Sequence, residues 1–169
     1  APKGHIYYPT SIGEVTDEKL VAAIRTGIKR NCRDMLRIPG GVAGAKGINY
    51  TAKNIRKWRD KLGERKAALY LGQIVRMQEE IGTGGGGFRY LYGAFLEEAA
   101  AITGKDELLI VSEKITKAGD MWRDSAVQMA GIYKGRLSAQ ADYNHCADIL
   151  NQISVVEKEA FLQLDKIKI

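Results

Sequence analysis

Hydrophobic residues recur along most of this chain at the three- and four-residue spacing that places them on one face of a helix. The first such run extends from the capping residue Thr16 to Arg37. The spacing predicts a second helix over about Tyr50 to Leu62 and a third over about Glu64 to Ile81. The intervening segment IPGGVAGAKG holds a proline and four glycines, so we expect it to break the helix.

The second half of the chain repeats the pattern three times. A run that begins at Phe88 and ends at Thr103 carries the clearest apolar stripe, and another helix is expected over about Lys105 to Lys134. A last helix, capped by Ser138, is expected to reach Leu164. The fold class predicted is therefore all-α, with about six helices packed as an irregular bundle.

The N-terminus has a different character. Residues 4–9 read GHIYYP, in which Ile-Tyr-Tyr favours an extended backbone and the proline ends it. One extended segment cannot form a sheet alone. We therefore divide the chain into a short extended arm, residues 1–15, and a helical domain, residues 16–169.

Composition limits the classes of protein that this chain can be. Its 169 residues, 45% hydrophobic and 27% charged, are ordinary for one soluble domain. No apolar stretch approaches the roughly 18 to 20 residues of a membrane span, so no membrane partner is expected. Cys32 and Cys146 lie far apart without a CxxC spacing. We interpret them as reduced thiols of the core in a cytoplasmic protein.

The net charge of +6 is concentrated, because residues 53–66 carry seven basic side chains and two acidic ones. Lys53, Lys57 and Lys61 share one outward helical face, whereas Trp58 falls on the apolar stripe. A plain solvated face is the first interpretation, an acidic protein partner the second, and nucleic acid the least favoured.

The sequence IGTGGGGFRY places five glycines in six positions at the start of a helix. Gly82, Gly84 and Gly87 match G-x-G-x-x-G, but a helix enters this loop where a dinucleotide site needs a strand. Helix N-termini bind anions, which makes Gly84, Gly85, Gly86, Gly87 and Arg89 candidate ligand-binding residues. A tight corner between helices and a ligand-contacting loop both remain open.

Other reactive residues give weaker patterns. His145 and Cys146 are adjacent on a helix and point about 100° apart, so they do not form a catalytic pair. Asp142, His145 and Asp148 could share a face, but the chain has no Glu-x-x-His motif of a di-metal bundle. Asp120 and Arg123 are read as a surface pair. The sequence thus predicts no catalytic residue, no metal and no cofactor.

The string IGTGGGGFRYLYGAFLEEAA, with Gly119-Asp120-Met121-Trp122 downstream, resembles the C-terminal helical domain of bacterial proteins similar to the butirosin-biosynthesis acyltransferase H. The resemblance implies that a papain-like domain precedes this one and carries the cysteine nucleophile. It also implies that Ala1 marks a cut in a longer protein and that the extended arm pairs with the missing domain. The best-known reaction of that family moves an acyl group from an acyl carrier protein onto an amino group.

Carrier proteins are acidic, so an acyl carrier protein would suit the face formed by Lys53, Lys57 and Lys61. The leading hypothesis is a non-catalytic helical module of an acyltransferase- or cysteine-peptidase-like protein that contributes to substrate or acyl-carrier binding. The first alternative is a stand-alone scaffold without a ligand, and the second is a nucleic-acid-binding module. For the scaffold, Gly85→Ala should change stability by about a kcal/mol or less, unless φ is positive there.

Overall fold

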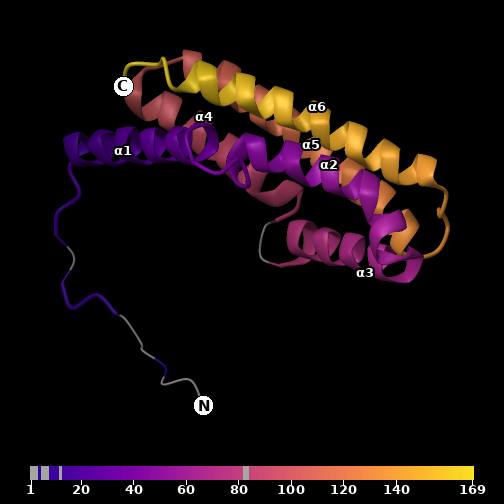
Figure 1. Ribbon diagram of the computed structural model, residues 1–169. Helices are drawn as coiled ribbons and strands as arrows, with labels where there is room; N and C mark the ends of the chain where they lie inside the picture. Colours follow the sequence, from indigo (N-terminus) through magenta and orange to yellow (C-terminus); the bar gives the residue numbers. More distant parts are fainter. Residues whose placement is uncertain (1–3, 5–7, 12, 82–83) are drawn as a thin grey trace.

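The computed structural model describes residues 4, 8–11, 13–81 and 84–169 (Figure 1). Within them the chain forms six α-helices and no strand, which confirms the all-α prediction. The helices are α1 (Asp17–Leu36), α2 (Gly44–Leu62), α3 (Glu64–Val75), α4 (Arg89–Thr103), α5 (Glu107–Tyr133) and α6 (Gln140–Leu164).

The third predicted helix changes its winding before it ends. After Val75 it widens into the π-helical turn η1 (Arg76–Glu80), and the glycine loop then leads through the short 3₁₀ turn η2 (Gly86–Phe88) into α4. Such single π-turns recur at functional sites. This change of winding brings Gln78 and Glu79 to the base of the glycine loop, where both make polar contacts.

The predicted start of the second helix is wrong, because α2 begins at Gly44, six residues before Tyr50. Close backbone contacts explain the error. A Cβ atom on Gly44, whose φ is +59°, would lie 2.4 Å from the carbonyl oxygen of Met35. One on Gly47 would lie 2.7 Å from the carbonyl oxygen of Val42. These glycines permit helix packing here and do not break the helix.

The predicted N-cap is confirmed for the first helix and wrong for the last. Thr16 caps α1 as predicted, with its hydroxyl oxygen accepting a hydrogen bond from the Lys19 N–H at 3.4 Å. The cap of α6 is Ala139 and not Ser138. Asp142 accepts a hydrogen bond from the Ala139 N–H at 2.8 Å, so a carboxylate in the first turn stabilises this end without a capping hydroxyl.

The two longest helices, α5 and α6, lie side by side along the whole molecule, and the other helices pack against their two ends (Figure 1). This arrangement divides the core into two hydrophobic clusters. One joins α1 and α4 to the N-terminal half of α5 and the C-terminal end of α6. The other joins α2 and α3 to the C-terminal half of α5 and the N-terminal half of α6.

Both cysteines are free and lie in the core, one in each cluster, as the sequence indicated. Burial raises the pKa of Cys32 to about 11 and that of Cys146 to about 12. Among the described residues, no helix is both long and apolar enough to cross a membrane.

The described part of the N-terminal arm, residues 4, 8–11 and 13–15, has no regular secondary structure. Residues 5–7 of the GHIYYP segment lie outside the described residues, as does Gly82 of the glycine loop. Pairing of the arm with a preceding domain therefore stays a prediction.

Candidate functional site

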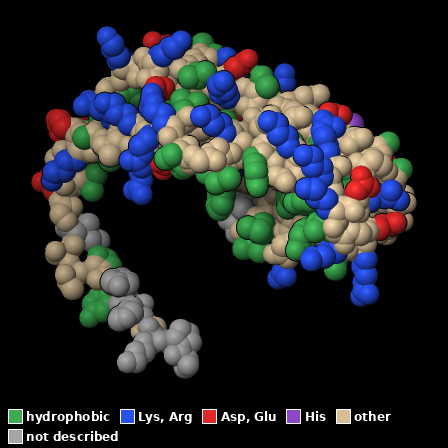
Figure 2. Space-filling model, in the orientation of Figure 1, with side chains coloured by type: hydrophobic (Ala, Val, Ile, Leu, Met, Phe, Trp, Pro, Cys, Tyr) green, Lys and Arg blue, Asp and Glu red, His purple; other side chains and the backbone are tan. Residues whose placement is uncertain are grey.

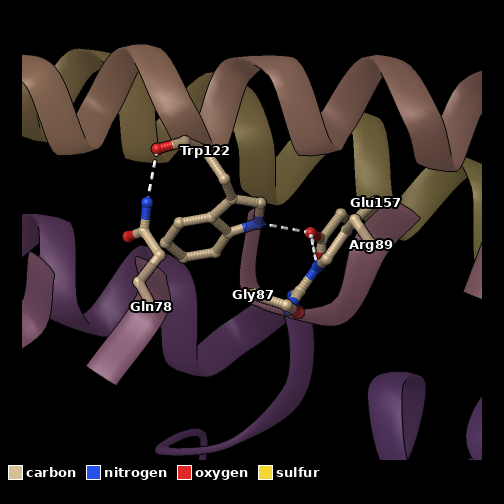
Figure 3. Close-up of polar contacts among 5 residues, drawn as sticks. All are labelled: Gln78, Gly87, Arg89, Trp122 and Glu157. Carbon is tan, nitrogen blue, oxygen red and sulfur yellow. Dashed lines mark hydrogen bonds and ion pairs between the residues drawn. The ribbon is translucent and has the colours of Figure 1, made fainter. Parts of the chain in front are cut away.

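A buried ion pair joins the glycine loop to the last helix (Figure 3). The first residue of α4, Arg89, turns its side chain toward Glu157 of α6. Its Nε donates to one carboxylate oxygen at 2.7 Å and its Nη2 to the other at 2.9 Å. The Glu157 side chain is completely buried, whereas that of Arg89 is 24% exposed. This two-point geometry is the strongest form of the pair.

Trp122 of α5 completes the network. Its indole Nε1 donates to Glu157 at 2.6 Å, and the guanidinium carbon of Arg89 lies 5.1 Å from the ring centroid. On the other side, the Gln78 side-chain amide of η1 donates to the Trp122 carbonyl oxygen. Figure 3 shows Trp122 between Gln78 and the ion pair. Four elements are thereby fixed around one carboxylate.

The glycine loop needs glycine for its backbone conformation. From Gly84 to Gly87 the φ angles are +68°, +85°, +57° and +55°, and Phe88 follows at +71°. L-residues with side chains rarely adopt such angles. At Gly85 ψ is 162°, a combination that is essentially restricted to glycine. The small effect expected of Gly85→Ala in the scaffold alternative therefore no longer applies.

The loop already binds a carboxylate of its own chain. Glu79 accepts a hydrogen bond from the Gly86 N–H at 3.1 Å and lies 3.9 Å from the guanidinium of Arg123. The predicted Asp120–Arg123 pair has other partners: Tyr90 donates to Asp120 at 2.8 Å, and Arg123 lies over the Tyr90 ring. One of the loop N–H groups expected to bind an anion is thus already occupied by the Glu79 carboxylate.

Arg89 keeps hydrogen-bonding capacity beyond this network. A guanidinium carries five N–H donors. Two are directed at Glu157, and Nη1 donates to the Gly87 carbonyl oxygen at 2.6 Å. Among the described residues this leaves one donor on each terminal nitrogen. Arg89 can therefore receive an anion without giving up Glu157.

A cleft of about 390 Å³ lies beside the ion pair. Its walls are formed by α2, the segment before it, α3, η1, the end of the glycine loop, the start of α4, α5 and α6. Among the described residues that line it, Arg89 is the one with a charge. The lining residues are Val42, Ala43, Gly44, Gly47, Ile48, Thr51, Ile74, Met77, Gln78, Gly87, Arg89, Trp122 and Leu150. In Figure 2, hydrophobic side chains border a hollow between α2 and α3. A volume of this size is that of a small-molecule site.

Comparison with known proteins places the whole helical bundle in one family. Residues 1–164 match the model described as Domain of unknown function (DUF4872). The chain belongs to this family. No curated protein and no solved structure matches the chain.

The DUF4872 domain brings only some of the predicted site residues together. Gly87 and Arg89 line the cleft, whereas Gly85 and Gly86 are buried behind them against Glu79 and Gly119. Gly84 is exposed at the start of the loop. Ligand binding by these residues stays a prediction.

Lys53, Lys57 and Lys61, the lysine row, are all exposed on α2, the helix that also forms one wall of the cleft. Figure 2 shows Lys and Arg side chains over this part of the surface. Two arginines of the same basic stretch, residues 53–66, have carboxylate partners: Arg56 pairs with Asp148, and Arg59 lies 3.8 Å from Glu64. Trp58, half-buried against Tyr70, packs on the core.

The weaker candidates lie apart from the cleft. Asp142 caps α6, Asp148 pairs with Arg56, and His145 is exposed beside the buried Cys146. In the described part of the chain, no three His, Cys, Asp or Glu residues are grouped so that they could hold a metal ion.

Sequence reasoning missed Glu157, the centre of the network. A signal for it exists, because Ile153, Glu157, Ala160 and Leu164 follow one another at helical spacing on the buried face of α6. An acidic residue in an apolar stripe indicates a buried partner of opposite charge.

Proposed function

We propose that this DUF4872 domain is a non-catalytic binding module of an acyltransferase- or cysteine-peptidase-like protein, as the resemblance to the butirosin acyltransferase H family implies. The cleft would hold the acyl chain or the acceptor substrate, and the lysine row would dock an acidic acyl carrier protein. The observation that carries the proposal is the cleft, whose described lining residues are mostly apolar and include one charged side chain, that of Arg89.

The chemistry of the cleft favours an amphipathic anion. Ile48, Ile74 and Leu150 offer an apolar surface for a hydrocarbon chain. The two remaining N–H donors of Arg89 suit a carboxylate or a thioester carbonyl at one end. Because Glu157 and Gly87 already fix the guanidinium, little side-chain entropy is lost on binding.

A matched pair of variants tests the cleft. Val42 lines it and is 63% exposed, whereas Val127 of α5 lies outside it and is 68% exposed. Titration calorimetry with octanoate should show binding to the parent domain, weakened about tenfold by Val42→Glu through charge repulsion and unchanged by Val127→Glu. Absence of octanoate binding, or equal losses in both variants, would refute the role of the cleft.

The docking face is tested separately with an acyl-loaded carrier protein at low salt. Lys57→Glu/Lys61→Glu should abolish binding, while Lys29→Glu/Lys117→Glu, which makes the same change of charge on α1 and α5, should leave most of it. Equal effects of the two pairs would mean that only net charge matters. If neither octanoate nor the carrier binds, the ligand-free scaffold becomes the better description.

A further inference from the structure

A second groove, of about 460 Å³, lies on another side of α2, between this helix, α6 and the end of α1. It shares no lining residue with the cleft beside Arg89. Its lining residues are Met35, Leu36, Gly41, Ala45, Lys46, Asn49, Tyr50, Lys53, Ser154, Val155 and Lys158.

The groove is strongly cationic. Lys46 and Lys53, seven residues apart on α2, line it together with Lys158 of α6, and the described lining residues include no Asp or Glu. Within the described residues none of the three lysines forms an ion pair. Asp34, which precedes the lining residue Met35 on α1, pairs with Arg33 at 2.8 Å. Three unneutralised ammonium groups around one hollow attract an anion of more than one charge.

The groove also has apolar lining, and two of its polar side chains already have partners. Met35, Leu36 and Val155 supply hydrocarbon surface. The Ser154 hydroxyl donates to the Ala45 carbonyl oxygen at 2.7 Å, and Asn49 donates to Asn151 at 3.2 Å. The lysine ammonium groups are therefore the main donors that the groove offers to a ligand.

We propose that this groove binds a phosphate monoester with an aliphatic body. Lysine acts toward phosphate as a flexible point charge, and three of them match the charge of about −1.5 to −2 that a monoester carries at neutral pH. The volume exceeds the needs of a phosphate group alone, which leaves room for an organic body on Met35 and Leu36. The first turn of α2 has no acidic side chain, so its dipole adds to the positive potential.

This site goes beyond the proposed function and does not depend on it. Lys53 of the lysine row also lines the groove, whereas Lys57 and Lys61 do not, and the proposed cleft uses Arg89. The test therefore changes Lys46 and Lys158, which belong to neither.

The experiment is a calorimetric titration with hexyl phosphate, repeated with inorganic phosphate. Hexyl phosphate should bind more tightly than inorganic phosphate because its chain can pack on the apolar lining residues. Lys46→Gln/Lys158→Gln should weaken the binding of hexyl phosphate at least about tenfold. The matched variant Lys29→Gln/Lys117→Gln removes the same charge elsewhere and should change it less than about twofold. All four side chains are exposed, and circular dichroism verifies that both variants fold.

Two outcomes would overturn the proposal: no binding of hexyl phosphate, or equal weakening by the two variant pairs. A further arm separates the sources of the phosphate group. The parent domain is sedimented with phosphatidylcholine vesicles that contain phosphatidic acid. If it co-sediments with them and Lys46→Gln/Lys158→Gln does not, the site binds a lipid headgroup. Binding of hexyl phosphate without vesicle binding would assign it to a water-soluble ester.

Discussion

Removing the Arg89 side chain should destabilise the domain more than removing the charge of its partner. In Arg89→Met the carboxylate of Glu157 stays fully buried and keeps only the Trp122 N–H of its three hydrogen bonds. Breaking a buried pair from one side costs about 3–5 kcal/mol of unfolding free energy.

In Glu157→Gln the amide oxygen can still accept a hydrogen bond, and Arg89 remains 24% exposed to water. The expected loss is therefore smaller, about 1.5–3 kcal/mol, as for a hydrogen bond to a charged group.

The double variant Arg89→Met/Glu157→Leu provides the sharpest test of this reasoning. It removes both charges and leaves the Trp122 N–H as the main unsatisfied group, which costs about 1–3 kcal/mol. The double variant should thus be more stable than Arg89→Met alone. Urea denaturation followed by circular dichroism, with a common slope, measures all three differences.

A loss below about 1 kcal/mol in Arg89→Met would mean that the ion pair contributes little to the fold. A double variant less stable than Arg89→Met would show that an unpaired buried carboxylate is not what destabilises Arg89→Met. The result also decides how Arg89 variants are used in binding studies. If Arg89→Met is destabilised as expected, its weaker ligand binding cannot be assigned to a lost contact, which is why the cleft is tested at Val42.

Further outcomes concern the backbone and the thiols. Gly44→Ala should destabilise the domain by about 1–3 kcal/mol or more, because φ is +59° and the new Cβ would lie 2.4 Å from the Met35 carbonyl oxygen. The control Gly27→Ala, within α1 and open to space, should stabilise it by up to about 1 kcal/mol; both are measured by urea denaturation. Cys32 and Cys146 should not react with a thiol reagent at pH 8 until the domain unfolds, which absorbance of the released product follows. Because folding raises the pKa of these thiols to about 11 and about 12, stability should be complete below the ordinary thiol pKa and fall as pH rises above it. Replacing both by Ala should flatten that decline in urea midpoints measured from neutral to alkaline pH.

The helices were predictable because apolar spacing reports burial directly, and α1 even begins at the expected cap. The start of α2 was not predictable from local pattern. Gly44 and Gly47 read as helix breakers, yet each lies where a Cβ would collide with a carbonyl group of a preceding segment. Tertiary packing overrides propensity at such positions.

The candidate site was predictable in part for a similar reason. A glycine-rich segment before an apolar helix indicates a shaped loop, and Arg89 at its end was identified. The orientation of Arg89 depends on Glu157, which lies 68 positions further along the chain. The Gly86 N–H is likewise bonded to Glu79, which lies seven positions earlier and in a different element. Spacing along one helix carries no information on such partners.

The division of the core into two clusters has a consequence for how the domain opens. Glu157 lies on α6 between the residues of the two clusters, and its partner Trp122 packs against the second cluster. Two continuous helices and one polar network therefore connect the two ends. Each end therefore has a buried cluster of its own and is expected to open as a separate cooperative unit. Amide hydrogen exchange should reveal two groups of protected amides with different opening free energies. Loss of the Arg89–Glu157 pair should uncouple them further, so that one end of the molecule unfolds while the other remains folded.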